Sequence, residues 1–170
     1  MEIYSFNNKK PIVASSAYIQ AGAKLEGEIM VEDYVSIWYN ATIRGDLTGI
    51  TLKKGCNIQE LTSIHSDPTF EVIVGENTTI GHNCIIHGSK IGNNTLIGMG
   101  SILLNGCEIG DNCLVAAGSL LTQNSKFPAK SLIMGSPAKV IRELKTDEIA
   151  TIIENGQHYA ELAQKHKKEE

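Results

Sequence analysis

An aliphatic residue returns at every sixth position along most of this chain, and few folds accommodate such a spacing. A period of six fits neither an α-helix, which repeats every 3.6 residues, nor an ordinary strand, which alternates every two. It is typical of the hexapeptide β-helix, in which six residues form one short strand and a corner, and three such units form a coil. The series contains Val13, Ile19, Leu25, Val31, Ile37, Ile43, Leu52, Ile58, Ile64, Val74, Ile80, Ile86, Ile91, Ile97, Leu103, Ile109, Val115 and Leu121. Insertions of three and four residues and one deletion interrupt it. The sequence predicts an all-β solenoid of about five coils.

The position four residues after each of these anchors is small or aliphatic, and we expect it to be buried as well. The first six such residues are Ala17, Ala23, Ile29, Val35, Ala41 and Leu47. All four cysteines, Cys56, Cys84, Cys107 and Cys113, fall in the same position. We interpret them as small core residues rather than as disulfide partners or metal ligands. Free thiols favour a reducing compartment.

Composition excludes several classes of function. The net charge of −4 over 170 residues gives no basic surface for nucleic acid. No apolar run approaches the roughly 18 residues that a membrane span needs. The N-terminus, Met1-Glu-Ile-Tyr-Ser, has neither the basic start nor the apolar stretch of a signal peptide. We therefore expect a cytoplasmic protein.

The six-residue period ends after Leu121, and a helical period replaces it near the C-terminus. We expect the solenoid to occupy residues 1–135, with a turn at Met134–Lys139 leading out of it. Residues 136–170 then contain a helix of roughly twenty residues that begins with Thr146 as N-cap and packs along the solenoid. Gly156 predicts a kink or a weakened helix, and we expect the charged tail Lys165–Glu170 to fray.

Three of the five histidines lie close together in the sequence, at His65, His82 and His87. Neutral imidazole is the commonest metal ligand in proteins, and three histidines with an open fourth position are the pattern of a catalytic zinc site. Once the insertions are removed, His65 and His87 are one coil apart and each follows an anchor directly. They should stack on one face about 4.8 Å apart, and Arg44 should occupy the equivalent position one coil before His65.

His82 falls on a neighbouring face or corner, where Glu60 is the matching position one coil earlier. A single subunit should therefore not bring His82 to the same ion as His65 and His87. A three-sided prism packs naturally into a closed ring of three. We expect a homotrimer whose metal sites are shared, with His65 and His87 from one subunit and His82 from the next.

The chain resembles the gamma-class carbonic anhydrases and their bacterial relatives over nearly its whole length. The motifs that carry the resemblance are Ile43-Arg-Gly-Asp46, Asn57-Ile-Gln-Glu-Leu-Thr-Ser-Ile-His65, Ile80-Gly-His82, Ile86-His-Gly88 and Gly135-Ser-Pro-Ala138. The resemblance implies a left-handed parallel β-helix, a trimer, and a metal ion held by the three histidines. Zinc is the usual ion, and iron or cobalt serves in some members.

The resemblance also implies roles for five further residues. Arg44 and Asp46 match the pair that meets across the subunit interface, and Gln59 matches the glutamine that hydrogen-bonds the metal-bound water. Tyr159 resembles the tyrosine that many relatives bring towards the site. Glu60 stands where the family commonly has aspartate, and we expect it to retain a charge that can pair with Arg44.

A second departure concerns proton transfer. The archaeal prototype of the family that this chain resembles has acidic loops whose glutamates shuttle protons. This chain has no obvious counterpart of those loops, and Asp67 and Glu71 are the candidates for the role.

The leading hypothesis is reversible hydration of CO₂ to bicarbonate by a metal-activated water at a subunit interface. A hexapeptide-repeat acyltransferase would share the fold, the trimer and the Gly-Ser-Pro-Ala exit, and would use histidine as a general base on an acyl-CoA substrate. A third alternative is a metal-binding trimer with little catalytic activity. Three histidines in ligand register favour the first hypothesis, and a metal assay discriminates it from the second.

Overall fold

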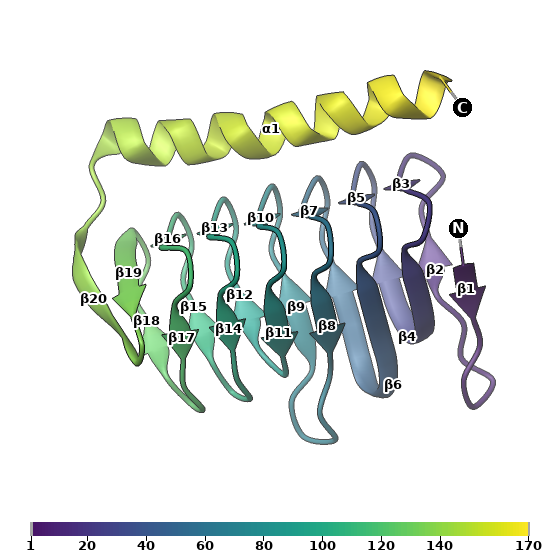
Figure 1. Ribbon diagram of the computed structural model, residues 1–170, viewed down its shortest axis with the longest axis horizontal. Coiled ribbons are helices and arrows are strands. Elements are labelled where there is room, and N and C mark those ends of the chain that lie inside the picture. The colour runs from purple at the N-terminus through teal and green to yellow at the C-terminus, as the bar shows by residue number, and fades with distance from the viewer. Residues whose placement is uncertain (1, 170) are drawn as a thin grey trace.

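The computed structural model describes residues 2–169 and shows a three-sided parallel β-helix with one long helix beside it (Figure 1). Seven parallel strand segments are stacked on each face, so the solenoid has about seven turns. The predicted solenoid is confirmed, but the count of about five coils is too low. The series from Val13 to Leu121 forms six coils by itself, and strands before and after it complete the seventh.

Two long strands, β4 (Lys24–Val31) and β6 (Thr42–Leu52), bend around a corner and contribute to two faces. The first face combines their N-terminal halves with β1 (Glu2–Tyr4), β8 (Ser63–His65), β11 (Ile85–His87), β14 (Ile102–Leu103) and β17 (Leu120–Leu121). The second face combines their C-terminal halves with β2 (Ile12–Val13), β9 (Val72–Val74), β12 (Lys90–Ile91), β15 (Glu108–Ile109) and β18 (Lys126–Phe127).

The third face is a separate sheet that also carries the exit from the solenoid. Its parallel strands are β3 (Tyr18–Ile19), β5 (Ser36–Ile37), β7 (Asn57–Ile58), β10 (Thr79–Ile80), β13 (Leu96–Ile97), β16 (Leu114–Val115) and β19 (Ser131–Gly135). A tight turn then leads into β20 (Ala138–Glu143), which pairs antiparallel with β19. The predicted turn at Met134–Lys139 is therefore present.

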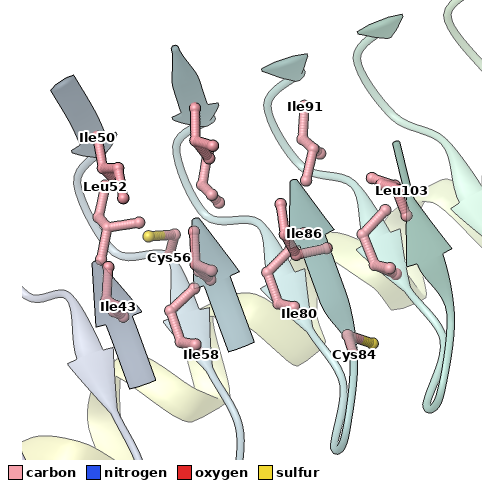
Figure 2. Close-up of a cluster of buried hydrophobic side chains, with 14 of the residues drawn as sticks. Ile43, Ile50, Leu52, Cys56, Ile58, Ile80, Cys84, Ile86, Ile91 and Leu103 are labelled. Atoms are coloured by element: carbon pink, nitrogen blue, oxygen red, sulfur yellow. The ribbon is translucent and has the colours of Figure 1, made fainter. Parts of the chain in front are cut away.

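The anchor residues point into the solenoid and stack coil upon coil (Figure 2). On the first face the parallel register places one column in the order Leu25, Ile43, Ile64, Ile86 and Leu103, each at most 1% exposed. Each such side chain contributes about 1.5–3 kcal/mol when fully buried. The six-residue period is therefore the sequence signature of this core.

All four cysteines are free thiols and fully buried in the same core, which confirms their interpretation as core residues. Because burial disfavours the thiolate, it raises the pKa of Cys107 to about 11 and raises the pKa of the other three cysteines as well.

Leu47 does not follow the pattern. We expected it in the buried slot four residues after Ile43, yet its side chain is 49% exposed. The reason is that β6 continues as one strand through the three-residue insertion, and the pairing of β4 with β6 shifts register there. The insertion thus breaks the six-residue phase before the next inward position, Ile50, is reached.

The C-terminal helix, α1 (Thr146–Glu169), is 24 residues long and lies beside β3, β5 and β7 of the third face (Figure 1). Gly156 marks no break in it. A Cβ at Gly156 would lie 2.4 Å from the backbone oxygen of Asn77, so glycine permits the close approach of helix and solenoid. In the described part of the chain, no helix combines the length and apolar character that crossing a bilayer requires.

The end of α1 is held in place rather than frayed. Lys167 Nζ donates hydrogen bonds to the backbone oxygens of Ser15 (2.5 Å) and Ala17 (2.8 Å), and Gln164 Nε2 donates to Ser16 O (2.9 Å). The expectation of a frayed tail from Lys165 is therefore wrong for residues 165–169, and Glu170 lies outside the described residues.

Candidate metal centre

His65 and His87 lie side by side on the first face, as the repeat predicts. They are register partners in the parallel pairing of β8 with β11, and Arg44 is the partner of His65 in the pairing of β6 with β8. The two imidazole ring centroids are 5.0 Å apart. His65 Nδ1 and His87 Nε2 face each other at 3.1 Å.

The other nitrogen of each ring contacts an acceptor. His65 Nε2–H donates to Asp46 Oδ1 at 2.9 Å, and His87 Nδ1–H donates to Asn105 Oδ1 at 2.5 Å. With these nitrogens protonated, the two facing nitrogens both carry lone pairs in the neutral rings. Two nitrogens bound 2.0–2.1 Å from one tetrahedral ion would be about 3.3 Å apart. The pair is therefore arranged as two ligands of one cation.

Arg44 and Asp46 complete this cluster within one chain. Arg44 Nη1 donates to Asp46 Oδ2 at 2.5 Å, and its Nη2 lies 3.5 Å from His65 Nδ1. Although burial raises the pKa of Asp46, the hydrogen bonds from His65 and Arg44 outweigh it and leave that pKa below its ordinary value. Asp46 is thus a carboxylate that fixes the ring of His65. The pairing of Arg44 and Asp46 across an interface stays a prediction.

His82 lies at a corner away from this cluster, where its side chain is 43% exposed. Its Nδ1–H donates to Glu60 Oε2 at 2.7 Å, one coil earlier, as the matching position predicts. This bond leaves the Nε2 lone pair free to bind outside the chain. Within residues 2–169, no three His, Cys, Asp or Glu side chains are grouped to hold a metal ion. One chain therefore holds the facing pair His65 and His87 and, separately, the lone His82.

Gln59 and Tyr159 lie apart from the facing histidines in the single chain. Gln59 is 4% exposed, and its Nε2 donates to Asn57 Oδ1 at 3.2 Å in a buried network that runs through Thr79 to Asn155 of α1. Tyr159 packs against Trp38 with ring centroids 5.9 Å apart. Burial, together with the charge of Glu60, raises the pKa of Tyr159.

The structure adds Asn105 and Asp67 to the site, and neither was assigned these contacts from the sequence. Asn105 accepts from His87, while its own Nδ2 donates to Asp67 Oδ2 at 2.8 Å. The deletion between Ile86 and Ile91 places Leu104, not Asn105, one coil after His87 in the predicted phase. Asn105 instead reaches back from the following corner, which the periodicity alone does not indicate.

Comparison with known proteins places this chain in a family. Residues 88–123 match the family described as bacterial transferase hexapeptide, and residues 71–103 match the hexapeptide repeat of succinyl-transferase. A Methanocaldococcus jannaschii protein named "Probable carbonic anhydrase" is 42% identical over 153 residues, which cover 90% of this chain and 96% of that protein. A Geobacillus kaustophilus protein named carbonic anhydrase is 37% identical over 169 residues, covering 95% and 93%.

This chain belongs to the gamma carbonic anhydrase-like family of hexapeptide-repeat proteins. A solved Bacillus cereus structure, described as a candidate acetyltransferase, is 38% identical to this gamma carbonic anhydrase-like chain. It superposes with a TM-score of 0.98 over 99% of this chain and 98% of that one. The family's fold is thus shared in detail by a protein described in terms of a different reaction, and the fold alone does not assign the chemistry.

Proposed function

We propose that this protein is a carbonic anhydrase that hydrates CO₂ reversibly at a metal ion shared between subunits of a homotrimer. The observation that carries the proposal is the 3.1 Å distance between His65 Nδ1 and His87 Nε2. Both nitrogens carry lone pairs, because the other nitrogen of each ring donates its proton to an acceptor. Two lone pairs facing at that distance repel each other unless a proton or a cation lies between them. The residues present therefore fit two ligands of the family's metal, and His82 of the next subunit supplies the third.

The surface around His82 supports a subunit contact at this corner. Tyr39, Leu61 and Met99 occupy the corner in the coils around it and are 43%, 60% and 60% exposed. Leu61 also adopts a left-handed backbone angle, φ +63°, which costs a leucine about 1–2 kcal/mol. Asn40 and Asn83 adopt the same left-handed angle at this corner of the neighbouring coils, so the turn of the solenoid itself requires it. An exposed apolar corner that carries a lone histidine ligand suits burial against a second copy of the chain.

A bound zinc ion would supply a nucleophile from water at neutral pH, by lowering the pKa of that water towards about 7. Asp46 holds the ring of His65, and Glu60 holds the ring of His82, so that each presents one fixed nitrogen. Gln59 would orient the attacking water once its amide turns away from Asn57. Addition of the water oxygen to the carbon of CO₂ would yield bicarbonate and release one proton to solvent.

The proton released by the reaction needs an acceptor, and Asp67 and Glu71 are the candidate side chains. The two candidate shuttles are already engaged, since Glu71 Oε1 pairs with Lys90 at 2.9 Å and Asp67 accepts hydrogen bonds from Asn105 Nδ2 and Thr69 N. We therefore propose that external buffer accepts the proton. The turnover rate should rise with buffer concentration at constant pH and ionic strength.

The test combines elemental analysis with stopped-flow CO₂ hydration on the same metal-loaded sample, prepared without oxygen so that iron stays reduced. The proposal expects one metal ion per subunit and hydration that disappears when a chelator removes the metal. Stoichiometric metal without hydration would support a metal-binding trimer of little activity instead.

A hexapeptide-repeat acyltransferase remains the second candidate. The matching repeat families carry transferase descriptions, and so does the Bacillus cereus structure. Such an enzyme would use a single histidine as general base and would not need His65 and His87 with facing lone pairs. Acetyl-CoA-dependent acetylation of amines or hydroxyls that persists after metal removal would favour this candidate over a carbonic anhydrase.

A further inference from the structure

We infer that Asn105 is a positioning residue that selects the ring form of His87 required of a metal ligand, and that Asp67 fixes Asn105 for this task. The inference rests on the proposed metal site. Its evidence is a chain of two hydrogen bonds, from His87 Nδ1 to Asn105 Oδ1 at 2.5 Å and from Asn105 Nδ2 to Asp67 Oδ2 at 2.8 Å. Asp67 lies in the four-residue insertion between β8 and β9.

The orientation of the Asn105 amide follows from the chemistry of its neighbours. An ionised Asp67 carboxylate can only accept hydrogen bonds, so the NH₂ group of Asn105 must face it and the amide oxygen must face His87. The insertion holds Asp67 in place. Asp67 Oδ1 accepts from Thr69 N at 3.0 Å, Asp67 N donates to Phe70 O at 2.9 Å, and Thr48 Oγ1 donates to Asp67 O at 2.9 Å.

The amide oxygen in turn decides where His87 carries its proton. An acceptor facing Nδ1 stabilises the Nδ1–H form and leaves Nε2 with a lone pair. A free histidine side chain prefers the opposite form, with the proton on Nε2. In this site a proton on Nε2 would lie between His87 and His65, where it would hydrogen-bond to His65 Nδ1 and occupy the place of the cation. Asn105 thus keeps the facing pair His65 and His87 open for metal.

The ring form of His87 can be read without any metal. Protein labelled with ¹⁵N in the histidine rings has five such residues, and the spectrum of His87→Gln assigns the His87 signals. In the metal-free wild type we expect His87 as the Nδ1–H form. In Asn105→Ala we expect it to move towards the Nε2–H form, and Co²⁺ affinity to fall about 10–100-fold, as is usual when an outer partner of a ligand is lost.

Exchanging the side chains of Asn105 and Asp67 distinguishes a role in positioning His87 from a role in folding alone. Asn105→Asp alone puts two carboxylates in contact, which cannot both stay ionised, so Co²⁺ binding should weaken. In the double variant Asn105→Asp/Asp67→Asn, the carboxylate at position 105 accepts from His87, and the amide at position 67 donates to that carboxylate. The double variant should regain the Nδ1–H form and bind Co²⁺ within about threefold of wild type.

Lys90→Met is the matched control, because it removes an ion pair to the same insertion, at Glu71, but no contact of Asp67 or Asn105. It should leave the His87 ring form unchanged. Asn105→Ala with the wild-type ring form and wild-type Co²⁺ affinity would overturn the inference, and so would a double variant no better than Asn105→Asp. If wild-type protein binds no Co²⁺, the proposed function fails, while the ring form in Asn105→Ala still decides the role of Asn105.

Discussion

His65 Nδ1 lies 3.1 Å from His87 Nε2, across two successive coils of the solenoid. The repeat produces this contact, because each histidine directly follows a buried anchor and parallel pairing stacks equivalent positions. Asp46 and Asn105 accept hydrogen bonds from the far nitrogens of the two rings, so the facing nitrogens both carry lone pairs.

Glu60→Ala should weaken metal binding by about 10–100-fold, because it removes the acceptor that orients the ring of His82. Glu60→Gln retains an acceptor oxygen and should lose less. Isothermal titration with Zn²⁺ or Co²⁺ measures the affinity, and sedimentation velocity monitors the trimer. Unchanged metal affinity together with a weakened trimer would instead assign Glu60 to the pairing with Arg44 that we expect from its charge.

The four cysteines should not react with a thiol reagent at pH 8 while the protein is folded. Cys56, Cys84, Cys107 and Cys113 are fully buried, and burial raises the pKa of each thiol. All four should react at once in guanidinium chloride, which serves as the control. A cysteine that reacts in the native protein at the rate of a free thiol would contradict their place in the core.

Gly156→Ala should destabilise the protein, although alanine favours a helix by about 1 kcal/mol over glycine. The new Cβ would lie 2.4 Å from Asn77 O, and relieving such overpacking typically costs about 1–3 kcal/mol. Urea unfolding followed by Trp38 fluorescence reports on α1, because Tyr159 packs on Trp38. The exposed neighbour Gln157→Ala is the control and should change stability by less than about 0.5 kcal/mol. A stabilised Gly156→Ala would refute the close approach.

Glu148 should give the protein an acid-sensitive contribution to stability. Hydrogen bonds from the side chain of Arg142 and the backbone of Lys145 lower its pKa from 4.5 to about 2. A depressed pKa in the folded state stabilises the protein above pH 4.5, and this contribution is lost as the pH falls towards 2. The difference in melting temperature between wild type and Glu148→Gln should therefore be constant from pH 7 to 5, fall below pH 4.5 and approach zero as the pH passes below about 2. An equal difference at pH 2 and pH 7 would exclude this linkage.

Much of the fold could be predicted because every short strand of the solenoid needs one aliphatic side chain that points into the core. That requirement identified the core and placed Arg44, His65 and His87 in one column. It failed where the repeat is interrupted. Leu47 turns outward because β6 continues as one strand through an insertion while it bends around a corner. The period does not indicate β1, because Glu2–Tyr4 precedes the first regular anchor.

The site was only partly predictable for the same reason. Residues in register could be found by counting, and so could the lone position of His82 next to Glu60. Asn105 could not, because the deletion after Ile86 moves it out of the column and its side chain reaches His87 from a corner. The contact of Asp67 with Asn105 joins an insertion to a later coil, and no sequence spacing encodes that approach.

The central claim is that each chain carries two incomplete parts of one metal site, and mixed trimers test it most directly. His82→Ala and the double variant His65→Ala/His87→Ala, each with its own affinity tag, are refolded together, and doubly tagged trimers are isolated. Each parent trimer should hold no metal. Every mixed trimer, whether two-to-one or one-to-two, should contain one complete site and therefore one metal ion. Mixed trimers without metal, or His82→Ala trimers with a full complement, would contradict the shared site.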